Sequence, residues 1–187
     1  VGRPLKALDA GRGIPSGYGD LDWIYQQMHA AAARRPDICE VVDLTALYGT
    51  PPTHEGRHLF AVRISDNVGQ DEAEPAVLIV ANHHAREIGT PIVALRTIDN
   101  LVDGHGTDPR ITAAVDDHEI WIAPTWNPDG YQYVYDVDDL WRKNRRDKLC
   151  ATGGGTTTPG QGQDEEEAES TGEQAHPDDR GEHGPHE

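Results

Sequence analysis

Apolar residues recur at the spacing of a helix in two segments of this chain. The first segment begins after Asp20, a suitable N-cap, and stops before Pro36. Its apolar positions follow one helix face: Leu21, Ile24, Tyr25, Met28 and Ala32. The second segment opens with Thr90 and Pro91, which suit the N-cap and the first helical position. Its inner stripe has five members: Ile92, Leu95, Ile98, Leu101 and Val102.

Shorter apolar runs around these helices predict β-strands. Four strands are expected, at 38–44, 59–64, 76–81 and 119–124. The run at 76–81 is apolar throughout, which is typical of a central strand covered on both faces. Asp108 and Pro109 predict the start of a short helix that ends near Val115. Strands that alternate with helices predict an α/β fold with helices on both faces of the sheet.

A histidine and a glutamate three residues apart follow the strand expected at 76–81. His84 and Glu87 offer an imidazole nitrogen and a carboxylate oxygen, and catalytic zinc sites often combine two His and one Glu with a water. In α/β sheets, ligands bind beyond the carboxyl ends of the strands, where this pair stands. From the residues alone, His83 is a competing ligand, and a chance pairing in a surface loop is the alternative to metal binding.

Two further segments have both a structural and a functional interpretation. Residues 127–130, Asn-Pro-Asp-Gly, form a good turn sequence, because Pro fixes φ and Gly permits a positive φ. Residues 141–146, Trp-Arg-Lys-Asn-Arg-Arg, are either a solvated basic face or an anion-binding patch on an acidic chain.

The composition excludes some partners. The 187 residues carry a net charge of −17, which argues against nucleic acid and anionic membranes as partners. Residues 151–187 hold ten acidic residues and one arginine but no large apolar residue, so they are expected to be disordered. Three lysines stand beside thirteen arginines, which suits a high-salt organism or, alternatively, a GC-rich genome. No run is long enough for a transmembrane helix, and no signal-peptide pattern stands at Val1.

In their order and spacing, these pieces resemble the zinc metallocarboxypeptidases of the carboxypeptidase A, B and T type. The resemblance covers residues 18–150 and is carried by six segments: 18–25, 36–37, 55–57, 84–87, 127–130 and 141–143. It implies a mixed, twisted sheet with helices on both faces and zinc as the cofactor. By this resemblance His84 and Glu87 are zinc ligands. Arg142 is then the catalytic arginine that stabilises the oxyanion, and Arg86 binds the substrate, a peptide or protein C-terminus. Family members of this type are secreted, which implies an extracellular location.

The chain departs from this family after Cys150. There the family continues with an Asn-Arg pair that grips the substrate carboxylate, a third zinc ligand, and the Glu that acts as general base. Here a Gly/Thr-rich stretch and the acidic tail follow instead. Asn144-Arg145 stands too close to Trp141 to take the gripping role. The cysteine that matches Cys150 normally pairs in the missing region, and pairing of Cys150 with Cys39 is left open.

The sequence therefore predicts three parts: a lead-in segment at 1–19, the N-terminal half of a catalytic domain at 20–150, and the acidic tail at 151–187. An incomplete domain is expected to leave an unpaired sheet edge and exposed apolar surface. Two functional interpretations stand side by side: a zinc-dependent carboxypeptidase, or a truncated, inactive half-domain that at most binds zinc weakly. The tail offers further donors, but a disordered segment holds them in no fixed geometry: His176, His183 and His186.

Overall fold

A computed structural model describes residues 14–15, 17–70 and 72–146. Asp147–Glu187 lie outside the described residues. The predicted tail at 151–187, Cys150 and most of the predicted lead-in segment therefore lie outside them as well. In the described part of the chain, no helix is both long and apolar enough to cross a membrane.

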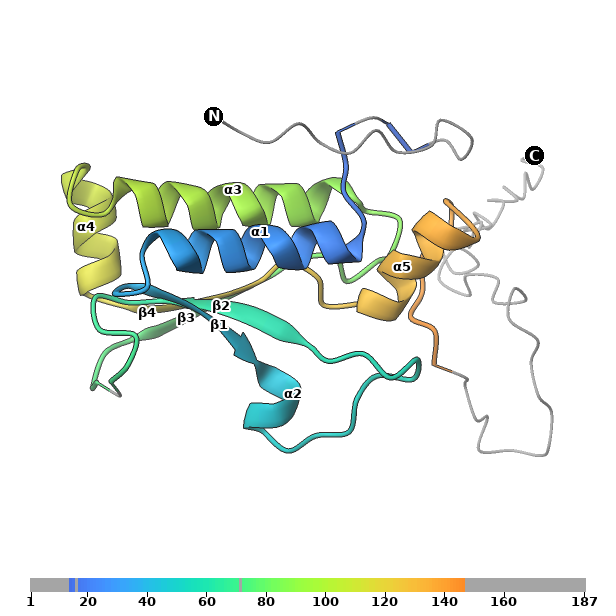
Figure 1. The fold of residues 1–187 in the computed structure, drawn as a ribbon, viewed down its shortest axis with the longest axis horizontal. Coiled ribbons are helices and arrows are strands. Elements are labelled where there is room, and N and C mark those ends of the chain that lie inside the picture. Colours follow the sequence, from blue (N-terminus) through green and yellow to red (C-terminus); the bar gives the residue numbers. More distant parts are fainter. Residues whose placement is uncertain (1–13, 16, 71, 147–187) are drawn as a thin grey trace, which may run out of the picture. The chain divides into compact units, whose positions relative to one another are not determined.

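Two long helices lie side by side along one face of the sheet: α1 (Leu21–Arg34) and α3 (Gly89–Gly104) (Figure 1). The Asp20 carboxylate caps α1 by accepting the Trp23 N–H at 2.9 Å, as its position predicts. The predicted N-cap Thr90 is wrong, because α3 begins at Gly89 without a side-chain cap. The Thr90 hydroxyl donates instead to the Glu87 carbonyl at 2.8 Å, so it ties down the preceding loop.

The sheet has four strands: β1 (Cys39–Asp43), β2 (Phe60–Ile64), β3 (Ala76–Val80) and β4 (Glu119–Ala123). Their order is β1-β2-β4-β3. Strands β1 and β2, and likewise β2 and β4, are antiparallel, whereas β3 and β4 are parallel. This mixed sheet with its helices confirms the α/β fold that the resemblance implies.

Three shorter helices complete the described elements: α2 (Leu44–Leu47), α4 (Pro109–Asp116) and α5 (Pro128–Asp136). The prediction of α4 is confirmed, and Asp108 caps it at the Arg110 N–H. The turn predicted at 127–130 is wrong, because these residues start α5. Asn127 is its N-cap and accepts the Gly130 N–H at 3.0 Å. An Asn followed by Pro suits a helix start as well as a turn, and here the helix forms.

The core lies between the sheet and the pair α1 and α3. Ile24 and Met28 of α1, Ile98 of α3, and Val62 and Ile122 of the sheet are at most 1% exposed. Together with their neighbours they form one apolar cluster, which holds the helices on the sheet.

The prediction that the run at 76–81 is a central, fully covered strand is wrong for the described part of the chain. In the described part, β3 is an edge strand that pairs only with β4. Val77, Leu78 and Ile79 are 40%, 62% and 37% exposed. The expected unpaired edge and exposed apolar surface are therefore found here.

Candidate metal and substrate site

The motif at residues 82–87 begins where β3 ends. Strands β3 and β4 are parallel, so the loops that follow them leave the same edge of the sheet. Two backbone bonds extend this pairing beyond the strands: the Ala81 N–H donates to the Ala123 carbonyl at 3.0 Å, and the Trp126 N–H donates to the Ala81 carbonyl at 2.9 Å. The motif and the start of α5 are thus held next to each other.

Asn82 folds the motif back on itself. Its φ is +56°, in the left-handed region, and it is only 1% exposed. Its backbone N–H donates to the Thr90 hydroxyl at 3.0 Å, and its side-chain amide donates to the carbonyls of His84 and Ala85, both at 3.2 Å. Sequence reasoning missed this role. The available signal was an Asn directly after a strand, because Asn is one of few non-glycine residues that enter this conformation readily.

His84 and Glu87 point their side chains toward each other. The Nδ1 atom of His84 lies 2.8 Å from Oε1 of Glu87, and these side chains are 38% and 46% exposed. The Glu87 N–H donates to the His84 carbonyl at 3.0 Å, so one turn of backbone presents both groups.

This donor pair fits one zinc ion. Zinc bonds of about 2.0–2.2 Å in a tetrahedral arrangement place two ligand atoms about 3.3–3.6 Å apart, so the pair would need to open by roughly 0.5–0.8 Å. A nitrogen and an oxygen donor are also the ligand types that catalytic zinc accepts. Within residues 14–15, 17–70 and 72–146, no group of three or more His, Cys, Asp or Glu residues is placed to hold a metal. The described part therefore brings together two candidate donors, His84 and Glu87.

The segment that contains Arg142 runs directly against the motif. The Ala85 N–H donates to the Arg142 carbonyl at 2.9 Å. Asn127 bridges the two segments, because its side-chain amide donates to the carbonyls of His83 at 3.3 Å and Lys143 at 3.1 Å. Arg86 reaches toward the same segment, with its Nη1 3.5 Å from the Leu140 carbonyl. The structure thus brings all four predicted site residues onto two adjoining segments.

Gly130 allows this close approach. A Cβ atom at Gly130 would stand 2.8 Å from Cβ of Ala85 and 2.6 Å from Nδ2 of Asn127. Such contacts are shorter than van der Waals separations, so a side chain here would push α5 away from the motif. The predicted reason for Gly130, a positive φ in a turn, is wrong, because its φ is not positive.

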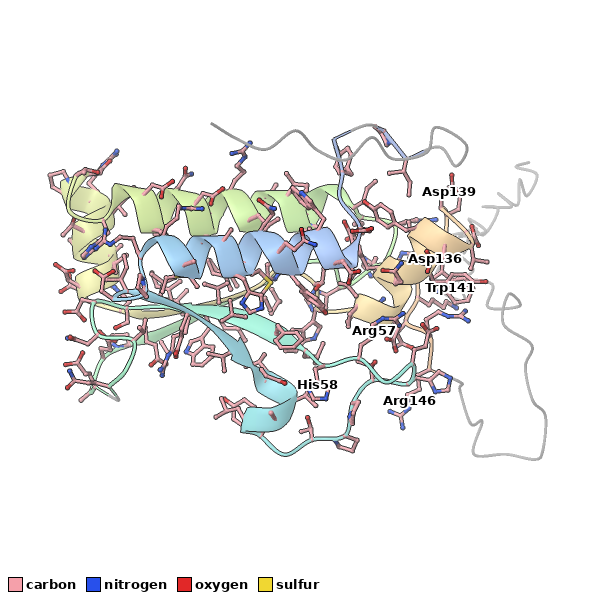
Figure 2. The ribbon with its side chains drawn as sticks, viewed as in Figure 1. Arg57, His58, Asp136, Asp139, Trp141 and Arg146 are labelled. Carbon is pink, nitrogen blue, oxygen red and sulfur yellow. The ribbon has the colours of Figure 1, made fainter. Side chains whose placement is uncertain are left out.

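A buried carboxylate anchors the start of α5. Asp129 is 4% exposed. It accepts hydrogen bonds from the Thr53 hydroxyl at 2.8 Å, the Glu55 N–H at 3.0 Å and the Arg57 guanidinium at 2.8 Å. Arg57 and Trp141 both lie beside α5 (Figure 2). These bonds fasten the loop before β2 to the helix that supports the motif.

Arg145 extends this network into the basic segment. Its guanidinium lies 3.7 Å from the ring centroid of Tyr133 and 5.1 Å from that of Trp141. Its Nε donates to Glu55 at 2.9 Å. Partial burial acts to raise the pKa of Glu55, but the hydrogen bonds from Arg57 and Arg145 outweigh it and hold this pKa below its ordinary value. Arg145 therefore lies in a packed structural contact and is not part of a freely solvated basic face.

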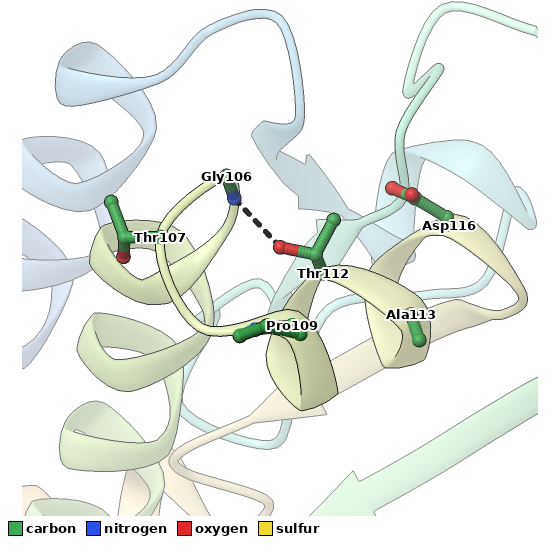
Figure 3. Close-up of a pocket in the computed structure, with 6 residues that line it drawn as sticks. All are labelled: Gly106, Thr107, Pro109, Thr112, Ala113 and Asp116. Carbon is green, nitrogen blue, oxygen red and sulfur yellow. Dashed lines mark hydrogen bonds between the residues drawn. The ribbon is translucent and has the colours of Figure 1, made fainter.

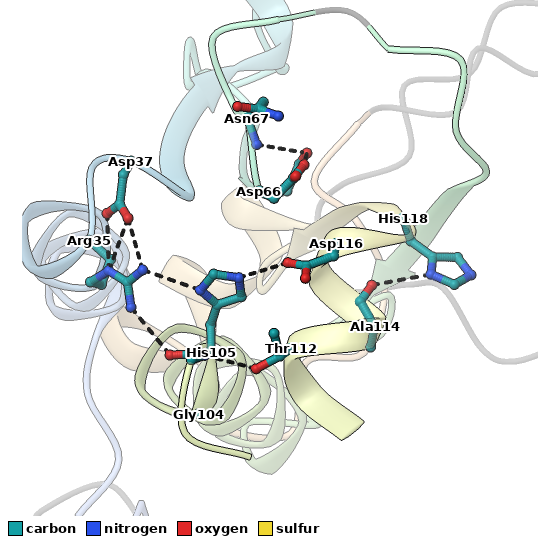
Figure 4. Close-up of polar contacts among 12 residues, drawn as sticks. Arg35, Asp37, Asp66, Asn67, Gly104, His105, Thr112, Ala114, Asp116 and His118 are labelled. Atoms are coloured by element: carbon teal, nitrogen blue, oxygen red, sulfur yellow. Dashed lines mark hydrogen bonds and ion pairs between the residues drawn. The ribbon is translucent and has the colours of Figure 1, made fainter. Parts of the chain in front are cut away.

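Two other features lie at the opposite ends of β3 and β4. A hollow is lined by Gly106, Thr107, Pro109, Thr112, Ala113 and Asp116 (Figure 3). Beside it, Arg35 donates to Nδ1 of His105 at 3.2 Å, and Nε2 of His105 lies 2.9 Å from Asp116 (Figure 4). Arg35 can only donate, so Nδ1 accepts and Nε2 carries the proton. This chain of contacts joins the ends of α1, α3 and α4, far from the motif, and we interpret it as structural.

Known proteins match most of this chain. A family model described as zinc carboxypeptidase matches residues 24–167. A zinc carboxypeptidase from Saccharothrix mutabilis subsp. capreolus is 42% identical over 142 residues, which are 75% of this chain and 32% of that protein. An inactive metallocarboxypeptidase from Talaromyces stipitatus is 35% identical over 150 residues, which are 78% of this chain and 24% of that protein.

The fold is matched in the same way. The crystal structure of thrombin activatable fibrinolysis inhibitor superposes with a TM-score of 0.62 at 27% identity, and the match covers 74% of this chain and 33% of that one. The chain thus spans a third or less of the length of these relatives.

Proposed function

This chain belongs to the zinc carboxypeptidase family, and from that membership we propose that it supplies one half of a zinc-dependent carboxypeptidase site. His84 and Glu87 hold the zinc ion in this proposal. The observation that carries it is the 2.8 Å separation of their donor atoms, on a loop that is half-exposed at the carboxyl end of a strand. The substrate is the C-terminus of a peptide or protein.

Each named residue has a separate task. When bound, zinc polarises the scissile carbonyl and activates a water for attack. Arg142 stabilises the negative charge that develops on the carbonyl oxygen, and its permanently charged guanidinium suits this task. The 2.9 Å bond from Ala85 to the Arg142 backbone supports the assignment, because it carries Arg142 next to the motif. Arg86, which is exposed beside the zinc ligands, binds the substrate.

A second interpretation is that the 187-residue chain is not itself an enzyme. No third donor joins His84 and Glu87 among the described residues, and three matched relatives are named inactive metallocarboxypeptidases. In this interpretation the chain is a truncated, inactive half-domain that at most binds zinc weakly and needs further residues for turnover. The family's secreted members extend the first proposal to an extracellular location, which detection of the native protein in the culture medium would test.

Zinc titration of the full chain tests the ligand assignment. We expect His84→Gln and Glu87→Gln to weaken zinc binding at least about tenfold, since even the loss of a group that only supports a ligand costs 10–100-fold. His83→Gln is the matched control, because His83 is an exposed neighbour with the same side chain, and it should retain binding. Loss of zinc in His83→Gln together with full binding in His84→Gln would refute the assignment.

Turnover separates the two interpretations. The full chain with zinc is incubated with peptide and ester substrates that have a free C-terminal carboxylate. Zinc-dependent release of the C-terminal residue, abolished by Glu87→Gln, establishes an enzyme. No release from a chain that binds zinc through His84 supports the half-domain.

A further inference from the structure

Two exposed aromatic rings lie beside the zinc motif, one on each of the loops that follow β3 and β4. His83 directly precedes the predicted ligand His84, and Trp126 directly precedes Asn127. We propose that these two rings form a subsite for an aromatic or large aliphatic side chain of the peptide substrate, on the N-terminal side of the scissile bond. This inference rests on the proposed carboxypeptidase function and adds a substrate preference to the same site.

The two rings form one surface. Their centroids lie 6.4 Å apart and their planes are tilted by 39°, which is within the range of paired aromatic rings. His83 is exposed, and Trp126 is 37% exposed although it is a large apolar residue. A side chain of a bound peptide can therefore contact both rings, and burial of their exposed faces favours an apolar side chain over a polar one.

The surrounding backbone holds both rings in place. The Trp126 N–H donates to the Ala81 carbonyl at 2.9 Å, and the Asn127 side-chain amide donates to the His83 carbonyl at 3.3 Å. Thr125 and Asn127, on either side of Trp126, are buried. Little ordering of the loops is then needed when a ligand binds, and rigidly held aromatic residues are typical of binding hot spots.

The place of the rings beside the motif indicates which part of a peptide they contact. Consecutive Cα atoms, such as those of His83 and His84, are about 3.8 Å apart. A carboxypeptidase substrate has one residue beyond the scissile bond, and all its other residues precede that bond. An extended peptide advances at most about 3.6 Å per residue, so the three residues before the bond lie within about 10 Å of the scissile carbonyl. One of these residues is therefore within reach of the rings.

The test follows the indole N–H resonance of Trp126 by NMR of the ¹⁵N-labelled full chain, once in EDTA and once with zinc chloride. Its disappearance in Trp126→Phe assigns the resonance. The probes are acetylated tetra-alanine and three analogues with phenylalanine second, third or fourth from the free C-terminal carboxylate. We expect one phenylalanine peptide to shift the resonance and to bind at least about fivefold more tightly than tetra-alanine. Its binding should be tighter with zinc chloride than in EDTA, because one peptide then spans both sites.

Variants assign this phenylalanine preference to the two rings. Trp126→Ser should abolish the preference, whereas Trp126→Phe, which keeps a ring, should retain most of it. His83→Gln should reduce the preference and leave the affinity for zinc unchanged. Tyr48→Ser is the control, because Tyr48 is an aromatic residue that is 70% exposed at the end of α2, and it should alter neither property. For the Ser variants, peptide binding is followed by the shifts of backbone amide resonances.

The other outcomes separate this subsite from the zinc assignment. A chain that binds zinc through His84 but shows no phenylalanine preference overturns the subsite and leaves the zinc ligands standing. A preference that Trp126→Ser does not change, or that Tyr48→Ser reduces equally, also overturns it. Equal binding of the preferred peptide in EDTA and zinc overturns its link to the zinc site. A Trp126-dependent preference together with zinc binding that His84→Gln does not weaken overturns the ligand assignment instead.

Discussion

Strands β3 and β4 are parallel neighbours whose side chains have opposite surroundings. Ile79 of β3 and Ile122 of β4 are register partners, yet Ile79 is 37% exposed and Ile122 fully buried. The more apolar of the two strands is the more exposed one, since β3 reads Ala-Val-Leu-Ile-Val and β4 reads Glu-Ile-Trp-Ile-Ala. β4 has strands on both sides, whereas β3 in the described part has only one. An apolar run therefore indicates that a strand is suited to a buried position, whether or not the described residues cover it.

The open edge and the incomplete site occur at the same place. β3 leads directly into the motif, so in the described part of the chain the strand that lacks a second neighbour also presents the predicted zinc ligands, which no third donor joins there. The open strand edge and the small number of donors both agree with a chain that spans a third or less of the length of its relatives. β4, by contrast, is paired on both sides, and the loop that follows it is anchored by Asn127 and Asp129.

The largest expected effect on stability comes from replacing isoleucine with alanine in β4, and the same substitution in β3 is its comparison. Ile122→Ala removes a fully buried side chain, and we expect a loss of about 2–5 kcal/mol in the free energy of unfolding. Ile79→Ala removes a side chain that is already 37% exposed, and we expect a loss under about 1 kcal/mol. Urea unfolding followed by circular dichroism measures both. Equal losses in the two variants would show that the β3 edge is covered in solution.

Local structure and core were largely predictable from the sequence, whereas the position of β3 was not. The helices were recognised because apolar spacing and capping residues are local signals, as at Asp20 and Asp108. The burial of β3 depends on a neighbouring strand, about which its own residues say nothing. The helix start at Asn127 was missed because Asn-Pro suits two structures, and only the contacts of Asn127 with the motif decide between them.

For the site, spacing and resemblance predicted which residues belong together but not what holds them. His84 and Glu87 lie in contact, as their separation of three residues suggests, although their role as ligands stays a prediction. Gly130 and Asp129 support the motif through contacts between segments far apart in the sequence, and no local pattern reveals such contacts. Asn82 acts within its own loop, so its only signal was its place directly after a strand.

A substitution at Gly130 tests whether α5 holds the motif in position. Gly130→Ala gains up to about 1 kcal/mol in helix propensity, but its new methyl group would stand within 3 Å of Ala85 and Asn127. Overpacking of this kind costs about 1–3 kcal/mol, so we expect a net loss of stability and weaker zinc binding. Gly69→Ala is the control, since nothing lies within 4 Å of its added Cβ. Unchanged zinc affinity in Gly130→Ala would show that α5 does not position the motif.

The exposed edge itself predicts association without metal. Leu78 is 62% exposed on an uncharged edge strand, and a lysine there is a common device against edge-to-edge pairing. We expect Leu78→Lys to reduce self-association in EDTA while it changes the free energy of unfolding by about 0.5 kcal/mol or less. Val93→Lys, at a similarly exposed apolar residue on α3, should leave association unchanged. Sedimentation velocity distinguishes the two, and an equal effect of both lysines would indicate a general charge effect.

The smallest expected effect concerns acid stability on the anchored side. The pKa of Glu55 is held below its ordinary value of 4.5 in the folded chain by Arg57 and Arg145. Its contribution to stability is therefore fully present above pH 4.5 and is lost as the pH falls through the lower folded value. Because Glu55 is 30% exposed, solvent limits that contribution to about 1 kcal/mol or less. Glu55→Gln should lower the unfolding free energy at pH 7 by this amount and flatten its decline below pH 4.5. Arg145→Gln, which leaves Arg57 in place, should give an intermediate slope, and a slope equal to that of the unaltered chain in both variants would contradict the role of this pair.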